Sequence, residues 1–203
     1  MKQTIINSTM NNIKKHKQLD EIKLAEIKYG LESLYLTLTK IFIIILISIP
    51  LGTLKELLYI FLFYGILRIT GFGAHTKTSI QCWVISIGTF TIIPFLAKTL
   101  IISKNLSLII MTLLLIHIML FAPADTEKRP LINAKKRLIY KIICTLNTLI
   151  YILITLFAYN PYFSNIFLFS ILIQVIMVLP ITYKLLGIKY NNYKNYKRKE
   201  ELT

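Results

Sequence analysis

The chain has 203 residues, of which 55% are hydrophobic, and its mean hydropathy is +0.63. This composition excludes an ordinary soluble globular domain, because long uncharged runs approach the ~20 residues that cross a bilayer as a helix. The net charge of +15 calls for no nucleic-acid partner, since the basic residues flank apolar segments and are explained by membrane topology and anionic lipids.

These features predict an all-α, polytopic membrane protein that forms a single integral membrane domain over residues 1–203. Residues 1–33 place Ile and Leu at roughly helical spacing among Lys and Glu. This pattern predicts either an amphipathic helix on the membrane surface or a solvated cytosolic helix. The transmembrane core is expected over residues 34–184, followed by a basic cytosolic tail over residues 185–203.

About six transmembrane helices are expected in the core. The apolar segments that predict them cover residues 34–54, 57–69, 79–97, 106–122, 142–158 and 164–184. The second segment is short for a full crossing, so it is tilted, extended by its flanks, or half of a re-entrant hairpin. The last two segments form a helical hairpin that turns at Asn160-Pro161.

Lysine and arginine are distributed unevenly between the two sides that this arrangement creates. One side carries seven in residues 1–40, two in 68–80, six in 123–141 and six in 184–203, whereas the other side carries three. Because cytoplasmic loops are enriched in these residues, both termini and the loop that contains His75 are expected in the cytoplasm. The expected location is a multi-pass position in a cell membrane.

One of three histidines and one of two cysteines lie at the boundary between the second and third segments, at His75 and Cys82. A cysteine attacks as the thiolate, which a nearby imidazole or a helix N-terminus favours. Thr78 or Ser79 is a suitable N-cap and would place Cys82 in the first turn of the third segment. The residues alone also leave a purely structural role for the pair open.

Helix geometry restricts this pairing. In one straight helix, residues 75 and 82 would lie about 10 Å apart along the axis, too far for a hydrogen bond. A catalytic dyad therefore requires that residues 71–76 do not form a continuous helix. Gly71 and Gly73 provide the necessary backbone freedom, because glycine adopts positive φ without strain.

Other polar residues near the membrane have alternative roles. Arg68 either binds a substrate carboxylate or a polar loop, or is a charge that reaches the membrane surface. His117, inside the fourth segment, is either functional or bonded to a neighbouring helix. Cys144 is expected to be a small core residue. No HExxH motif or Cys-His cluster occurs, so neither a metal nor another cofactor is expected.

Two motifs together resemble the accessory gene regulator B (AgrB) family over nearly the whole chain. The first comprises Arg68, the run Gly-Phe-Gly-Ala-His over residues 71–75, and Cys82. The second is the run Ala-Pro-Ala-Asp-Thr-Glu-Lys-Arg-Pro-Leu-Ile over residues 122–132. Phe72 departs from the family, which commonly has a second adjacent glycine at this point.

The resemblance implies a membrane-embedded cysteine endopeptidase of bacterial quorum sensing. His75 and Cys82 match the family's catalytic residues, and Arg68 and Gly73 match its arginine and glycine. The implied partner is an AgrD-like propeptide, whose C-terminal tail is cleaved through a Cys82 thioester to yield a cyclic thiolactone. The loop that contains Asp125 is either a substrate-docking element or a structural cytosolic turn.

Two other classes of function remain open from the sequence. The chain could be a non-catalytic peptide transporter in which His117 lines a path, or a structural membrane protein without chemistry. Anionic lipids are expected at the basic flanks, and the sequence leaves a homodimer open.

Overall fold

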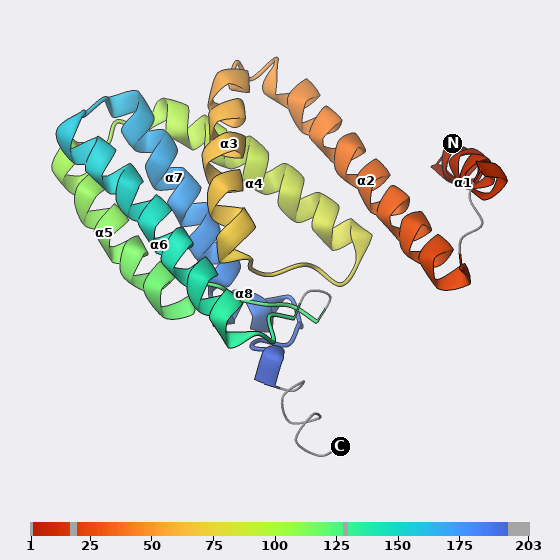
Figure 1. Cartoon of the computed structure of the whole chain (residues 1–203). Helices are drawn as coiled ribbons and strands as arrows, with labels where there is room; N and C mark the ends of the chain where they lie inside the picture. The colour runs from red at the N-terminus through yellow and green to blue at the C-terminus, as the bar shows by residue number, and fades with distance from the viewer. Residues whose placement is uncertain (1, 17–19, 128–129, 195–203) are drawn as a thin grey trace. The chain divides into compact units, whose positions relative to one another are not determined.

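The computed structural model describes residues 2–16, 20–127 and 130–194, and every extended regular element in this part is a helix (Figure 1). Five helices are long and apolar enough to cross a membrane: Lys23–Ser48, Ser79–Thr99, Lys104–Phe121, Ala134–Phe157 and Pro161–Val178. The prediction of an all-α, polytopic membrane protein is confirmed. Residues 195–203 of the predicted basic tail lie outside the described residues.

The first of two compact units covers Met1–Ile47. It contains α1 (Lys2–His16) and nearly all of α2 (Glu21–Ser48). Ile6 and Met10, one turn apart on α1, are buried. The expected change at residues 33 and 34 from a surface segment to the membrane core stays a prediction, and α2 begins at Glu21 and continues unbroken into the apolar segment. Leu, Glu, Lys and Ala all favour helix, so the change from polar to apolar composition does not interrupt it.

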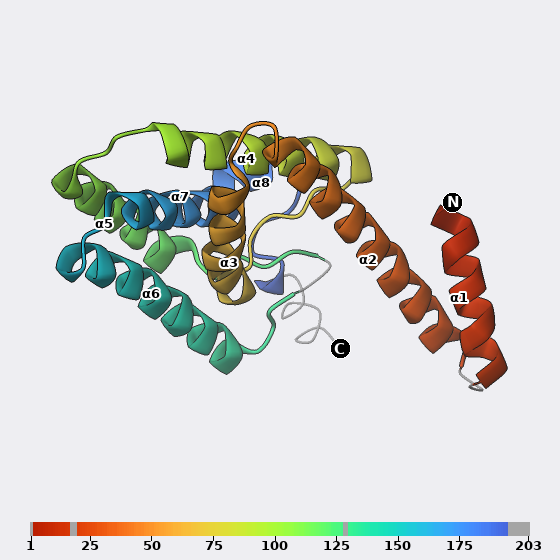
Figure 2. The same cartoon turned by 90° about the horizontal axis from the view of Figure 1, so that it is seen from above.

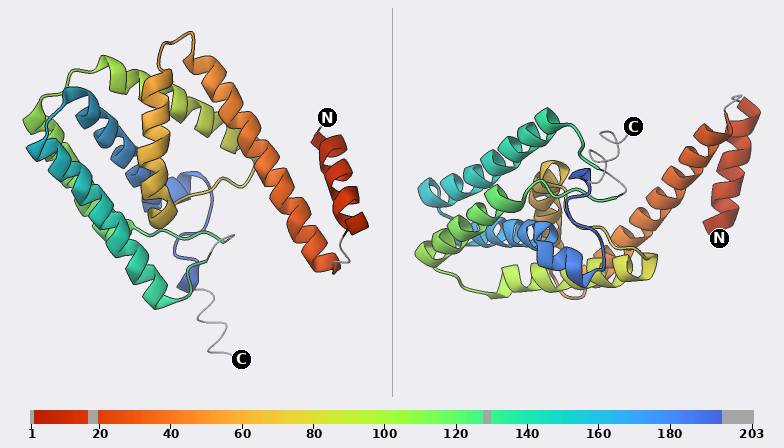
Figure 3. Two further views of the ribbon diagram at one scale, coloured as in Figure 1. Left: turned by 45° about the horizontal axis from the view of Figure 1, so that its top comes forward. Right: turned by 90° about the horizontal axis from the view of Figure 1, so that it is seen from below.

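The second unit, Ser48–Thr203, is a helical bundle around one buried helix. It comprises α3 (Leu54–Gly71), α4 (Ser79–Thr99), α5 (Lys104–Phe121), α6 (Ala134–Phe157), α7 (Pro161–Val178) and α8 (Pro180–Leu185). Helix α7 packs against α3, α4, α5 and α6 and is the most deeply buried of the membrane-length helices (Figures 2 and 3). Asn160 caps α7 and Pro161 occupies its first turn, which confirms the predicted hairpin turn.

Helix α3 corresponds to the short second segment of the sequence. Its 18 residues rise about 27 Å, and its charges lie near its ends, at Lys55, Glu56 and Arg68. Helix α3 packs against α4, α6 and α7, and α3, α4, α5 and α6 all expose large apolar side chains. Such extensive apolar surface is typical of a lipid-facing exterior.

The loops at one end of the bundle meet beneath the ends of its helices. Residues 72–78 join α3 to α4, residues 122–133 join α5 to α6, and residues 179–194 follow α7. Backbone hydrogen bonds join the first of these loops to the second and to the end of α7. The histidine-bearing loop therefore lies where three chain segments that are distant in sequence come together (Figure 1).

Candidate functional site

The chain leaves helical geometry directly after α3. Phe72 has φ 53° and Gly73 has φ 121°, and the next helix begins at Ser79. The prediction that residues 71–76 are not continuous helix is confirmed. Positive φ is free for Gly73 but costs a non-glycine residue such as Phe72 about 1–3 kcal/mol, so surrounding contacts must hold the segment in place.

Two neighbouring segments hold residues 71–74 from opposite sides. The Gly73 N–H donates to the Ala124 carbonyl at 2.8 Å, and the Ala124 N–H donates to the Gly71 carbonyl at 3.1 Å. On the other side, the Ala74 N–H donates to the Met177 carbonyl at 2.7 Å. These bonds satisfy backbone groups that the end of α3 would otherwise leave without partners.

Gly73 lies too close to its neighbours for any side chain. A Cβ atom at this position would lie 2.7 Å from the Met177 carbonyl oxygen and 2.3 Å from Nη1 of Arg68. Both its positive φ and this close approach therefore require glycine. The glycine that the sequence motif singled out permits the helix break and its dense packing.

The Arg68 side chain folds over the loop that follows its own helix. Its guanidinium donates to the carbonyl oxygens of Phe72 and, at 2.9 Å, of Ala74, with a longer contact of 3.3 Å to the Gly73 carbonyl. A planar guanidinium can serve several acceptors at once in this way. These contacts support one of the alternatives foreseen for Arg68, the binding of a polar loop.

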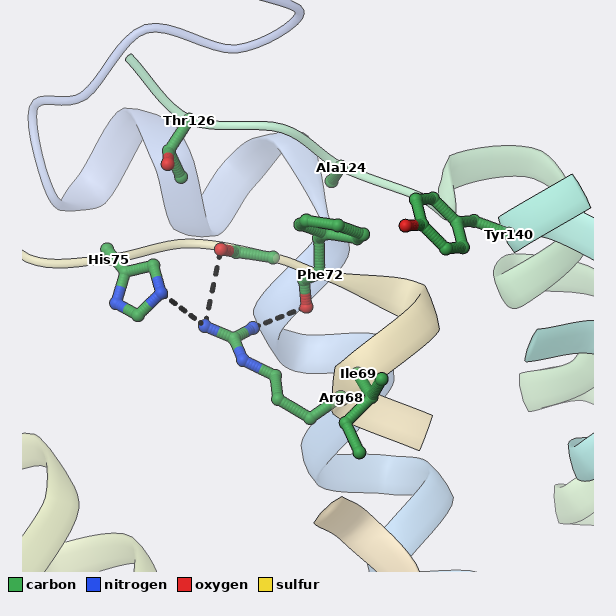
Figure 4. A pocket seen from close by; sticks show the side chains of 8 residues that line it. Arg68, Ile69, Phe72, His75, Ala124, Thr126 and Tyr140 are labelled. Atoms are coloured by element: carbon green, nitrogen blue, oxygen red, sulfur yellow. Dashed lines mark hydrogen bonds between the residues drawn. The ribbon is translucent and has the colours of Figure 1, made fainter. Parts of the chain in front are cut away.

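His75 is exposed and lies next to this guanidinium. Its Nε2 atom is 3.5 Å from Nη2 of Arg68 (Figure 4). Because arginine can only donate, a hydrogen bond across this contact requires Nε2 as the acceptor, and that role belongs to the neutral ring with its proton on Nδ1. A neutral imidazole is the form that can take a proton from a thiol.

Cys82 lies at the start of α4. The Thr78 side chain accepts from the Gln81 N–H, and the Cys82 N–H donates to the Thr78 carbonyl at 3.2 Å. Thr78 is thus the N-cap, as the sequence predicted. Cys82 is half-buried, forms no disulfide, and lies in the helical turn where unpaired N–H groups favour negative charge.

A cavity of about 420 Å³ lies against the histidine loop. It is lined by Arg68, Ile69, Phe72, Gly73, His75, Ala124, Thr126 and Tyr140 (Figure 4). Its size falls within the ~300–1,000 Å³ of typical ligand pockets. The structure therefore brings Arg68, Gly73 and His75 together, whereas Cys82 does not line this cavity and its pairing with His75 stays a prediction.

Asp125 is almost fully buried in the loop that carries Ala124 and Thr126. Its carboxylate accepts the N–H groups of Asn192 at 2.9 Å, Tyr193 at 2.8 Å and Leu131 at 3.3 Å. Burial raises the pKa of Asp125, while these hydrogen bonds and nearby Arg137 oppose the rise. The contacts fasten the C-terminal segment to the loop and support the structural alternative for Asp125.

Cys144 and His117, which also stand out in the sequence, lie outside the site. Cys144 is fully buried in the core, as predicted, and its thiol approaches the Leu67 carbonyl at 3.8 Å. The Nδ1 atom of His117 lies 2.8 Å from the carbonyl of Leu113, on its own helix. Among the described residues, no group of three or more His, Cys, Asp or Glu side chains could hold a metal ion.

Sequence reasoning missed the groups that support the loop from a distance. Gln174 is fully buried in α7 and donates to the Phe72 carbonyl at 3.1 Å. Tyr140 of α6 contributes an aromatic wall whose ring centroid lies 5.3 Å from that of Phe72. An uncharged glutamine inside an apolar run was the one available signal for Gln174.

Comparisons with known proteins match the same family over most of the chain. Residues 6–178 match the family Accessory gene regulator B. An AgrB-like protein of Clostridium acetobutylicum is 34% identical over 92% of this chain and 89% of its own length. An AgrB-like protein of Listeria welshimeri is 33% identical over 87% of each chain. The accessory gene regulator protein B of Staphylococcus aureus is 30% identical over 83% of this chain and 89% of its own. No solved structure matches the chain.

Proposed function

Because the chain belongs to the accessory gene regulator B family, which processes the AgrD autoinducer propeptide in quorum sensing, we propose that it is a membrane-bound cysteine endopeptidase. Cys82 is the nucleophile and His75 is the base. The substrate is an AgrD-like propeptide, which loses its C-terminal tail and is released as a cyclic thiolactone.

One observation carries this proposal: the helix break that the dyad requires is present and firmly held. Arg68, Ala124 and Met177 fix the loop that carries His75, and Thr78 begins a new helix four residues before Cys82. The histidine lies against the Arg68 guanidinium and borders a cavity of ligand size. These features support a site built for chemistry at the end of the bundle.

The reaction starts when His75 takes the proton of the Cys82 thiol. The thiolate attacks the carbonyl at the junction between the autoinducer region and the tail. The C–N bond breaks, His75 returns the proton to the leaving amine, and a thioester to Cys82 remains. A cysteine thiol within the peptide then attacks this thioester, forms the ring and restores the Cys82 thiol after one proton transfer.

The position of the dyad in the cell follows from the charges. Of 24 lysines and arginines, all but Lys55, Lys98 and Lys104 fall in regions assigned to the same side as the histidine loop. Under the positive-inside rule, both termini and the dyad are cytoplasmic. A basic cytosolic surface suits both anionic lipids and a propeptide with an acidic tail.

The transporter alternative gains no support from the described residues. His117, its principal sequence feature, contacts a carbonyl of its own helix. The cavity beside His75 is lined from the ends of α3 and α6 and from two loops, which places it at one end of the bundle.

A reconstituted assay tests the proposal. Purified protein in liposomes is mixed with a candidate propeptide, and the fragments are followed by mass spectrometry. We expect Cys82→Ala and His75→Ala to abolish release of the tail. Cys144→Ala is the matched control, because it removes the other cysteine of the chain, and it should retain cleavage. Release of the tail by Cys82→Ala would contradict the assignment, and transport of intact peptide by every variant would favour a transporter.

A further inference from the structure

The cavity beside His75 has a polar side and an apolar side. The polar side carries Arg68 and His75, whereas Ile69, Phe72 and Tyr140 supply the apolar side (Figure 4). Phe72 and Tyr140 come from different parts of the chain, and their rings are tilted by 51° at a centroid separation of 5.3 Å. Together they form a wall, here called the aromatic wall.

Phe72 occupies a backbone position that suits glycine. Its φ of 53° is strained for phenylalanine, and its backbone is held there through its carbonyl, which accepts from both Arg68 and Gln174. A glycine would adopt this conformation without strain and would leave the side-chain volume to the cavity. Phe72 therefore places its side chain beside His75, where it reduces the space in the cavity, at the cost of a strained backbone angle.

We infer that the aromatic wall lines the subsite for the substrate residue that immediately precedes the scissile bond, and that Phe72 limits the size of the apolar side chain that this subsite accepts. This inference rests on the proposed function. The peptide on the acyl side stays bound to Cys82 after the tail leaves, so a pocket that retains the intermediate must hold that side. An apolar side chain seated there also displaces water, which protects the thioester from hydrolysis.

The test compares propeptides that carry Ala, Leu, Phe or Trp immediately before the cleavage point. For the wild type, we expect kcat/KM to be highest with Leu and to fall at least tenfold with Trp. Phe72→Gly should raise the Trp-to-Leu ratio of kcat/KM about tenfold, in the range by which pocket size discriminates between substrates. Tyr140→Ala, which opens the same wall from another helix, should shift the ratio in the same direction.

Phe157→Ala is the matched control, because it removes an aromatic ring that is exposed at the other end of α6. It should leave the ratio unchanged. The ratio is the decisive quantity, since a more flexible loop in Phe72→Gly would slow all four substrates equally. If neither Phe72→Gly nor Tyr140→Ala changes the ratio by more than twofold, the inference is wrong.

A binding measurement keeps the inference separate from the proposed function. Peptide affinities are measured by fluorescence anisotropy in a Cys82→Ala background, with and without Phe72→Gly. The added substitution should improve the affinity for the Trp peptide relative to the Leu peptide, even where a variant no longer turns over. An unchanged relative affinity would overturn the wall as a selector, whereas cleavage by Cys82→Ala would overturn the proposed nucleophile alone.

Discussion

Substitution of Gly73 by alanine should disable the site while leaving the bundle assembled. The new Cβ would lie 2.7 Å from the Met177 carbonyl oxygen, whereas ordinary contacts begin near 3.4 Å, so the backbones must separate by about 0.7 Å. Met177 belongs to the buried helix α7 and cannot yield easily. The loop must move instead, and its bond from Ala74 to Met177 is strained or lost.

The energetic and kinetic effects follow from this displacement. Alanine at φ 121° costs about 1–3 kcal/mol, and a lost buried hydrogen bond adds about 1 kcal/mol. A shift approaching 1 Å at a residue two positions before His75 should lower kcat about 100-fold, as small misplacements of catalytic groups do. We expect folded protein with a lower unfolding temperature and severely reduced cleavage.

The assay is single-turnover cleavage in liposomes, combined with thermal unfolding in detergent. Gly65→Ala is the matched control, because it makes the same change in α3 with no atom within 4 Å of the new Cβ. It should retain activity and stabilise the helix by up to about 1 kcal/mol. Cleavage by Gly73→Ala within twofold of wild type would refute the reasoning about the packed loop.

Three further substitutions have expected outcomes. Arg68→Lys should lower kcat about tenfold or more in the cleavage assay, because an ammonium cannot serve the carbonyls of Phe72 and Ala74 together; activity equal to wild type would contradict this role. Asp125→Asn should lower stability by about 1–3 kcal/mol, since an amide leaves at least one backbone N–H without an acceptor. Burial raises the pKa of Asp125, so the contribution of this side chain to stability is largest below the pKa that it has in the unfolded chain and is lost as the pH rises. The difference in unfolding temperature between the wild type and Asp125→Asn should therefore narrow from about pH 4 to about pH 7. A difference that widens over this range would contradict the prediction. Cys144→Ala should destabilise the core by about 1 kcal/mol yet leave kcat unchanged, because Cys144 is buried and does not line the cavity.

Local rules predicted the parts of the site that local interactions determine. The broken segment at residues 71–76 followed from the helical rise, the Thr78 cap from hydroxyl chemistry, and the turn at Asn160-Pro161 from the fixed φ of proline. Each depends on residues within a few positions of one another. The two membrane motifs supplied the rest of the initial site through family resemblance.

Long-range contacts account for what the sequence did not reveal. Two of the three backbone partners of Asp125 lie 67 and 68 residues away, and Gln174 reaches Phe72 across 102 residues. Neither distance leaves a periodic trace in the sequence. The continuity of α2 across residue 33 has a local cause, because helix propensity is similar on both sides of the polar-to-apolar transition.

The central claim, that Cys82 forms a thioester with the peptide, is tested most directly by trapping that intermediate. A propeptide whose ring-forming cysteine is replaced by alanine cannot cyclise, so the acyl group should remain on the enzyme until water removes it. Intact-protein mass spectrometry should then detect an adduct of the truncated peptide, mapped to Cys82, labile to hydroxylamine and absent from Cys82→Ala. An adduct on Cys144, or release of the tail by Cys82→Ala, would contradict the account.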